Sequence, residues 1–221
     1  MRKISLSSIL VFNCLLILAI IVAVVATRFL FLSLPLGDFT GVVYTLIFII
    51  LFYLSSILIH RLFLYFFPLQ EGEIRKQSKQ EFVYHIYLLF YLLLFYSLTR
   101  SKVIPVPLMR LVYLMLGAKL GENTYSSGTI LDPFLTIIGS NTLLGQDCVL
   151  YSHAIEGKNI SHAVIRIGNN VTVGANAVIM SGVTVEDNAI IAAGAVVKKG
   201  EIIKAKEVWG GVPAKKIKTL P

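Results

Sequence analysis

Charged residues are scarce in this chain of 221 residues. They make up 14% of the sequence, whereas an ordinary soluble domain carries about 25%. Hydrophobic residues make up 56%, so both a simple water-soluble globule and a disordered tail are excluded. The chain also has only two cysteines. One falls in an apolar run and the other in the repeats described below, so we expect no disulfide.

Several common catalytic motifs are missing. The sequence contains neither a G-x-x-x-x-G-K-[ST] phosphate loop nor a G-x-S-x-G nucleophile elbow. Cysteine and histidine spacings give no zinc site, and residues 116–221 hold only two histidines, His153 and His162. We therefore expect no metal cofactor.

The two halves of the chain differ in composition. Residues 1–115 hold 20 of the 24 aromatic residues but 3 of the 16 glycines. They carry ten Lys and Arg against four Asp and Glu, whereas residues 116–221 carry ten against eight. Most of the formal net charge of +8 therefore accompanies the apolar half. This indicates membrane orientation and no nucleic-acid partner.

Three apolar runs in the first half are candidate membrane segments. Residues 4–27 carry no charge and exceed the roughly 20 residues that a helix needs to cross hydrocarbon. A signal peptide is the alternative, but this run is too long and lacks a small-residue cleavage site. The second run covers residues 39–59. The third, residues 82–98, is crowded with Tyr and Phe, which favour the headgroup level of a bilayer.

Basic residues predict how these segments are oriented. They gather at the N-terminus, in the loop at 60–81 and after residue 99, and positive-inside logic places all three in the cytoplasm. Three full crossings would export the second half of the chain. We therefore expect residues 1–99 to form a region of two spans plus a re-entrant or interfacial third segment in the cytoplasmic membrane.

Residues 100–118 are predicted to hold an amphipathic linker helix. Pro105 and Pro107 prevent an earlier helix start. The expected apolar face consists of Leu108, Leu111, Val112, Leu114 and Leu116. This face either caps the following domain or docks on the membrane, and the two roles are compatible.

The second half repeats every six residues. A branched aliphatic residue recurs from Ile167 to Val197, and the same phase runs upstream from Ile138 to Leu150. Such a period fits neither an α-helix nor a hairpin sheet. It fits a coil of short strands in which three hexads make one triangular turn, with Asn, Asp or Gly at the corners. The step from Leu150 to Ile167 is 17 residues, so residues 152–164 are an insertion.

Two runs of the second half are distinctive, IGNNVTVGANAVIMSGVTVEDNAIIAAGAVV and WGGVPAKKIK. They resemble the hexapeptide-repeat acyltransferases, which include galactoside, xenobiotic and colanic-acid acetyltransferases. With the preceding stretch from LGAKLG to HAIEG, they also resemble the transferase-like region of poly-lysine-type peptide synthetases. The resemblance covers residues 116–221 and implies a left-handed parallel β-helix over residues 119–221. It further implies acetyl-CoA or another acyl-CoA as co-substrate, and a homotrimer with sites between subunits.

The insertion supplies the catalytic candidates. His153 matches the family's catalytic histidine, and an imidazole can take a proton from an acceptor hydroxyl or amine near neutral pH. A loop histidine bonded to a backbone carbonyl is the structural alternative. His162 is the rival base or a substrate-binding residue. Glu156 is expected to orient His153, to bind the acceptor or to be a solvated charge. Asp132 matches a carboxylate that faces the acceptor in related sugar transferases, or is a turn residue.

The resemblance also implies a donor site. Ala175 and Ala193 match positions whose backbone amides hold the pantetheine arm of coenzyme A, although both are small corner residues in any case. Lys215 and Lys218 match basic residues that approach the nucleotide phosphates, with a solvated lysine cluster as the alternative. Trp209 either stacks near the adenine or covers the last coil.

Together these features predict a membrane-anchored, acetyl-CoA-dependent O-acetyltransferase whose catalytic domain faces the cytoplasm. A membrane anchor favours membrane lipid as a partner and a glycan, a glycolipid or a lipid-linked intermediate as the acceptor. Two alternatives stay open. One is acyl or aminoacyl transfer to an amine, and the other is a non-catalytic trimeric membrane scaffold.

Overall fold

The computed structural model describes residues 2–30, 37–101 and 103–221. The chain divides into two units. One contains the described residues of 2–69 together with 77–95 and is helical, and the other contains 70–76 and 96–221 and holds the strands. The short segment 70–76 thus belongs to the strand unit, although it connects two helices of the other unit.

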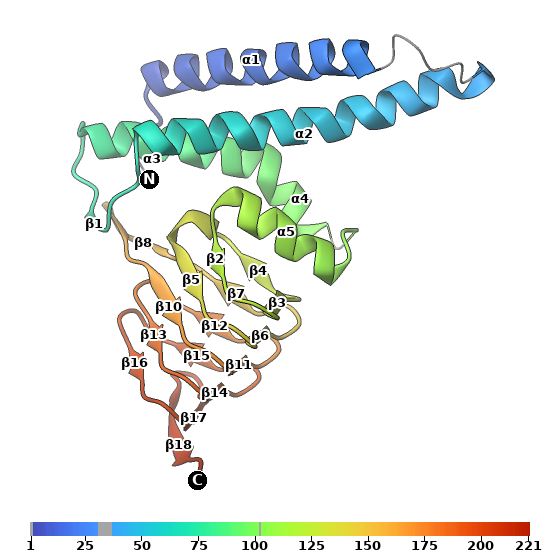
Figure 1. The fold of residues 1–221 in the computed structure, drawn as a ribbon. Helices are drawn as coiled ribbons and strands as arrows, with labels where there is room; N and C mark the ends of the chain where they lie inside the picture. Colours follow the sequence, from blue (N-terminus) through green and yellow to red (C-terminus); the bar gives the residue numbers. More distant parts are fainter. Residues whose placement is uncertain (1, 31–36, 102) are drawn as a thin grey trace. The chain divides into compact units, whose positions relative to one another are not determined.

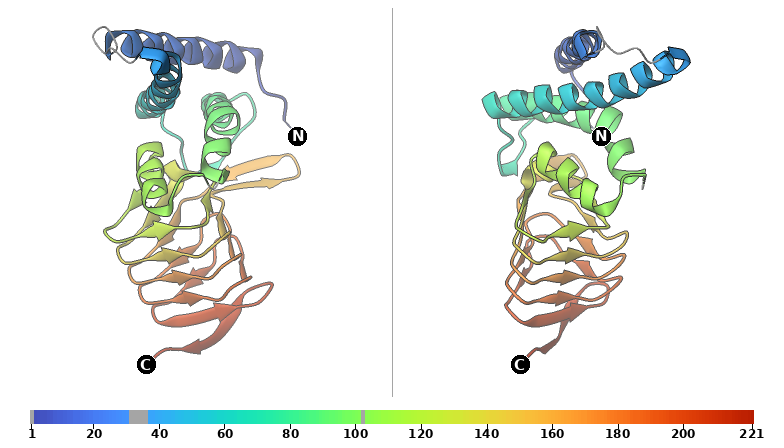
Figure 2. Two further views of the ribbon diagram at one scale, coloured as in Figure 1. Left: turned by 90° about the vertical axis from the view of Figure 1, so that its right-hand side faces the viewer. Right: turned by 45° about the vertical axis from the view of Figure 1, so that its right-hand side comes forward.

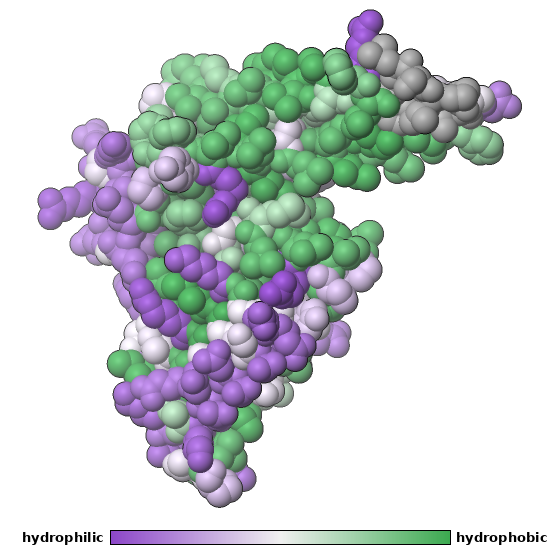
Figure 3. Space-filling model, viewed as in Figure 1, coloured by the Kyte–Doolittle hydropathy of each residue, from purple (hydrophilic) through white to green (hydrophobic). Residues whose placement is uncertain are grey.

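Three helices build the helical unit, as Figure 1 shows. Their bounds are α1 (Leu6–Leu30), α2 (Thr40–Phe66, after the short η1 at Gly37–Phe39) and α3 (Lys79–Phe90), which continues as a π-helical turn η2 (Tyr91–Phe95). Small side chains let α1 and α2 approach closely, since Ala19 and Ala23 are fully buried and Ser55 Oγ donates to the Ala19 carbonyl oxygen at 3.0 Å. The outward surface of α1 and α2 is hydrophobic (Figure 3).

Within the described residues, three helical segments are long and apolar enough to cross a membrane. They are Leu6–Leu30, Gly37–Phe66 and Lys79–Arg100. The first overlaps the expected run at 4–27, and the second contains the expected run at 39–59. The third is 22 residues long and has the length of a full span, so its interfacial placement stays a prediction.

The strand unit begins with two helices, α4 (Tyr96–Arg100) and α5 (Val106–Leu116). After them the chain winds into a coil of short strands, visible from two sides in Figure 2. The strands of the unit are β1 (Gly72–Glu73), β2 (Lys119–Leu120), β3 (Tyr125–Ser126), β4 (Thr129–Ile130), β5 (Thr136–Ile138, after η3 at Pro133–Leu135), β6 (Leu143–Leu144), β7 (Val149–Leu150), β8 (His153–Glu156), β9 (Asn159–His162), β10 (Ile165–Ile167), β11 (Thr172–Val173), β12 (Val178–Ile179), β13 (Thr184–Val185), β14 (Ile190–Ile191), β15 (Val196–Val197), β16 (Ile202–Ile203), β17 (Glu207–Gly210) and β18 (Lys215–Thr219).

The coil has three parallel faces. Its sheets have the orders β16-β13-β10-β5-β2, β18-β17-β14-β11-β6-β3 and β15-β12-β7-β4, and within them only β18 pairs antiparallel. Ile167 lies beside Val185, three hexads further along the chain. The predicted left-handed parallel β-helix is confirmed. Between β5 and β10 the step from one strand to its neighbour is longer than three hexads, since Ile138 lies beside Ile167. The extra residues are those of the insertion.

The repeat explains why these residues form a coil. The aliphatic side chains at the sixth positions stack inside and are almost wholly buried, as Val173 and Ile191 illustrate. Asn and Asp take positive φ at the corners, for example 54° at Asn170 and 57° at Asn176. A Cβ at Gly174 would collide with the backbone nitrogen of Ala193 in the next coil, so this turn requires glycine.

Helix α5 packs on the first coil with a face that shares only Val112 and Leu116 with the predicted one. Its buried side chains are Met109, Val112, Tyr113 and Leu116. Leu108 and Leu111, which were expected on the packed face, are exposed. The helix is apolar on both sides, so its periodicity alone could not select the packed face. Tyr113 fixes the choice, because its hydroxyl donates to the Gly128 carbonyl oxygen at 3.1 Å and accepts from the backbone N–H of Ile130 at 3.2 Å.

Candidate active site

The insertion at residues 152–164 is an antiparallel β-hairpin. Strands β8 and β9 pair directly, and Gly157, with a φ of 64°, lies in the turn between them. The hairpin leaves the coil where the chain passes from the four-stranded to the five-stranded sheet, and Figure 2 shows it projecting sideways.

A third strand of this small sheet comes from a remote part of the sequence. Strand β1 pairs antiparallel with β9, and the Ile74 N–H donates to the Ile160 carbonyl oxygen at 2.8 Å. Ile74 is 2% exposed. The Glu71 carboxylate accepts the Val164 N–H at 3.0 Å and forms an ion pair with Arg166 at 3.0 Å. No pattern in the sequence indicates this strand.

Asp132 and His153 form a hydrogen-bonded pair at the base of the hairpin. Nδ1 of His153 lies 2.7 Å from Oδ2 of Asp132. The same oxygen accepts the backbone N–H groups of Ser152 at 2.9 Å and of His153 at 3.2 Å. Because a carboxylate can only accept, His153 donates through Nδ1, and its Nε2 is the nitrogen that can take a proton.

Buried hydroxyl groups hold this pair on the coil. Thr136 Oγ1 donates to the Asp132 carbonyl oxygen, and Ser152 Oγ donates to that of Leu135, both at 2.9 Å. From the next coil, Ser181 Oγ donates to the Ser152 carbonyl oxygen at 2.9 Å. Each of these three hydroxyl-bearing residues is buried, so the backbone on both sides of Asp132 and His153 is fixed.

Burial and charge set the protonation of the pair. Burial lowers the pKa of His153, but the hydrogen bond and the charge of Asp132 more than offset it and raise this pKa above its usual value. Burial raises the pKa of Asp132, and the contacts with His153 then bring it below the usual value. Asp132 is 3% exposed, whereas the His153 side chain keeps 29% of its surface exposed. A partly exposed imidazole that is supported by a buried anion can accept a proton from a bound molecule.

Glu156 does not orient His153. Its carboxylate forms an ion pair with Lys199 at 3.1 Å and is exposed. The physical reason is strand geometry, since residues three positions apart in a strand point to opposite faces. Asp132 takes the orienting position instead, because its carboxylate contacts Nδ1 of His153. That Asp132 also faces the acceptor stays a prediction.

His162 is part of the hairpin interior. It lies directly across from His153 in the hairpin register but is 1% exposed. Burial lowers the pKa of His162 to about 4, against the opposing charge of Asp132, so its imidazole is neutral at physiological pH. His162 has almost no accessible surface, and its role as a substrate-binding residue stays a prediction.

Ala175 and Ala193 occupy equivalent turns of successive coils. Together with Gln146 and Ser127 they form what we call the turn column, one residue per coil at the corner between the six-stranded and the four-stranded sheet. Carbonyl oxygens of Ala175, Gln146 and Ser127 accept N–H groups from the next turn of the column at 2.8, 2.8 and 3.3 Å. His153 lies at another corner, after the four-stranded sheet, so one chain does not bring His153 and the turn column together.

The predicted phosphate-binding lysines lie on the last strand. Lys215 and Lys218 are exposed on β18, which extends the sheet that leads into the turn column. Lys216, which was not predicted, forms an ion pair with Glu207 at 2.7 Å. Trp209 Nε1 donates to the same carboxylate at 2.8 Å, which ties this indole to strand β17.

No cluster of three or more His, Cys, Asp or Glu side chains able to hold a metal occurs among the residues that the structure describes.

A known protein family matches the repeat region of this chain. Residues 165–199 match the family described as bacterial transferase hexapeptide, with six repeats, so the expected hexapeptide repeat is confirmed there. No curated protein matches the chain.

Several solved structures are similar in fold. A hexapeptide-repeat-containing acetyltransferase from Vibrio cholerae O1 biovar eltor, complexed with acetyl coenzyme A, is 24% identical with a TM-score of 0.45, over 48% of this chain and 61% of that one. A galactoside acetyltransferase in complex with coenzyme A is 27% identical with a TM-score of 0.48, over 60% and 80%. A maltose O-acetyltransferase from Clostridium difficile 630 is 19% identical with a TM-score of 0.45, over 60% and 85%. The chain thus spans less than two thirds of the Vibrio protein.

Proposed function

We propose that this chain is an acyl-CoA-dependent acyltransferase in which His153 is the general base. The observation that carries the proposal is the Asp132–His153 pair at 2.7 Å. It lies at the root of a hairpin inserted into a coil whose residues 165–199 match bacterial transferase repeats. A buried anion, a partly exposed imidazole and an Nε2 able to take a proton are the parts that direct acyl transfer requires.

The chemistry needs no covalent enzyme intermediate. An acceptor hydroxyl attacks the thioester carbonyl carbon while Nε2 of His153 takes its proton, and a C–O bond forms. The tetrahedral intermediate then collapses, the C–S bond breaks, and the proton passes from His153 to the departing sulfur to give free coenzyme A. Asp132 fixes the tautomer and stabilises the imidazolium, and backbone amides stabilise the oxyanion.

The donor site is proposed to follow the turn column. Backbone amides at Ala175 and Ala193 hold the pantetheine arm, and Lys215 and Lys218 approach the phosphates as point charges. Because His153 lies at another corner of the coil, a complete site takes His153 from one copy and the column from its neighbour. A closed homotrimer provides three such sites.

A membrane location favours an acceptor that is itself bound to the membrane. Three segments of the described chain are apolar and long enough to cross it, and basic residues lie next to each of them. We propose an integral protein of the cytoplasmic membrane with the coil in the cytoplasm. There it O-acylates a glycan, glycolipid or lipid-linked intermediate, with an acetyl group as the simplest donor.

The test compares two histidines of one hairpin. In membranes that contain the full-length protein, transfer of radiolabel from acetyl-CoA into lipid and polysaccharide fractions is measured for His153→Gln and His162→Gln. His153→Gln should reduce the rate by about 10²–10⁴, as expected when a general base is lost. Transfer at close to the wild-type rate by His153→Gln, with complete loss in a folded His162→Gln protein, would contradict the assignment.

A non-catalytic scaffold predicts a different result. Titration of the purified protein with coenzyme A should show binding if the turn column is a donor site. No binding at millimolar ligand would favour the scaffold and reject the proposed function.

A further inference from the structure

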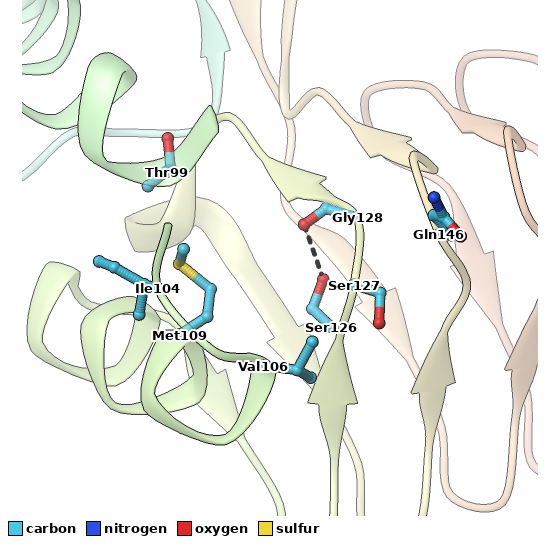
Figure 4. A pocket seen from close by; sticks show the side chains of 8 residues that line it. All are labelled: Thr99, Ile104, Val106, Met109, Ser126, Ser127, Gly128 and Gln146. Carbon is cyan, nitrogen blue, oxygen red and sulfur yellow. Dashed lines mark hydrogen bonds between the residues drawn. The ribbon is translucent and has the colours of Figure 1, made fainter. Parts of the chain in front are cut away.

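A cavity of about 300 Å³ lies at the top of the turn column, within the strand unit (Figure 4). One wall comes from the linker and the start of α5, and the other comes from the first two coils. The wall residues that matter here are Ile104, Val106 and Met109 on the linker side and Ser127, Gly128 and Gln146 on the coil side.

The lining of the cavity suits an uncharged, apolar group. None of its eight lining residues carries a charge. On the coil wall, the Gly128 carbonyl oxygen already accepts hydrogen bonds from Ser126 Oγ at 3.0 Å and from the Tyr113 hydroxyl at 3.1 Å. On the linker side the cavity is lined by apolar side chains, with Val106 beside Ser126 and Met109 extending toward Thr99 (Figure 4). The polar lining residues, Thr99, Ser126, Ser127 and Gln146, are uncharged, so a hydrocarbon would lie against the linker side.

The position of the cavity identifies its occupant. Ser127 and Gln146 line it and are also the first two members of the turn column. Successive coils are about 4.8 Å apart. Gln146 therefore lies one such distance beyond Ala175 along the column, on the side away from β18. With the phosphates near β18 and the pantetheine arm along Ala193 and Ala175, the thiol end lies toward Gln146. The group carried on the sulfur then enters the cavity.

We infer that this cavity binds the hydrocarbon chain of the acyl thioester, so that the enzyme prefers chains longer than acetyl. The inference rests on the proposed function and names its donor class. The cavity of about 300 Å³ is about ten times the roughly 30 Å³ that a water-sized group takes. Acyl chains of about four to eight carbons fit this volume, whereas an acetyl group leaves most of it empty.

A chain-length series tests the preference. Full-length protein is assayed in membranes with acetyl-, butyryl-, hexanoyl- and octanoyl-CoA, and binding of each thioester is measured separately. We expect kcat/KM to rise at least about tenfold from acetyl to hexanoyl, because methylene groups that enter an apolar pocket discriminate on this scale. A flat or falling profile would overturn the inference and leave the proposed function intact.

Two substitutions on one helix locate the effect. Val106→Phe fills the cavity, and Leu111→Phe adds the same ring to an exposed position of α5 that does not line it. Val106→Phe should lower the hexanoyl-to-acetyl ratio of kcat/KM by about tenfold or more, and Leu111→Phe should leave that ratio unchanged. If Val106→Phe instead raises KM for the acceptor and leaves the donor ratio unchanged, the cavity holds the acceptor's lipid and the inference is wrong. If no thioester binds at all, the proposed function fails together with the inference.

Discussion

One carboxylate controls what His153 can do. Asp132 is buried and contacts the histidine through both its ring and its backbone N–H. Its charge holds the pKa of His153 above the usual value although burial acts in the opposite direction. A general base must be neutral before it accepts a proton, so the rate should rise as pH increases through this pKa.

Substituting Asp132 with Asn should move that pH dependence. Asp132→Asn removes the charge that raises the pKa of His153, and burial then lowers it, so the acid limb of the kcat/KM profile shifts to lower pH. The plateau rate should fall by about 10²–10⁴, because the amide no longer fixes the tautomer or stabilises the imidazolium. Glu156→Gln on the same hairpin should change neither quantity. An unshifted acid limb in Asp132→Asn would show that His153 is not the titrating base.

The Asp132–His153 contact could not have been predicted from the repeat alone. Three hexads would place Asp132 beside Leu150, whereas the structure pairs Ile130 with Leu150, and this brings Asp132 and Ser152 to the same corner of successive coils. The burial of His162 could not have been predicted either. It depends on a third strand that no local pattern of the hairpin reveals.

That third strand, β1, is the least expected element of the site. It is two residues long and pairs with a segment almost ninety positions away, so neither period nor composition indicates it. The coil was predictable for the opposite reason, because an aliphatic residue recurs at the same inward position of every hexad. The packed face of α5 falls between these cases, since Leu111 and Val112 are equally apolar and only the contact with the coil distinguishes them.

Strand β1 should hold the hairpin in its productive position. Ile74→Ala removes a buried side chain, a change that costs about 2–5 kcal/mol in a packed core, and should release β1 from β9. Hydrogen exchange at residues 159–162 should accelerate. The value of kcat should fall, by up to about 100-fold if His153 shifts by an ångström, with KM for the donor unchanged. Glu73→Ala, exposed on the same strand, is the matched control, and faster exchange with an unchanged kcat would reject this positioning role.

At the scale of the whole molecule, the basic residues predict where the coil lies. Arg75, Lys76 and Lys79 follow the second apolar run and Arg100 follows the third, so positive-inside logic keeps both regions in the cytoplasm. A reporter enzyme that is active only outside the cytoplasm, fused after Pro221, should therefore give no signal. A fusion after Asp38, between the first two apolar runs, should be active. A strong signal from the fusion at Pro221 would place the coil outside and separate it from cytoplasmic acyl-CoA.

The separation of His153 from the turn column within one chain makes the assembly itself testable. Homotrimers of His153→Gln lack the base, and homotrimers of Ala175→Trp have a blocked column, so each should be inactive. In trimers mixed at random from equal amounts of both chains, about a quarter of the sites combine an intact His153 with an intact neighbouring column. Co-expression should therefore restore about a quarter of wild-type transfer.

Co-expression of His153→Gln with Asp132→Asn should restore none, because both changes lie on the same side of the site. If the first pair forms mixed trimers, verified by intact mass, and remains inactive, then His153 and the column of a single chain form the site, and the arrangement between subunits is wrong.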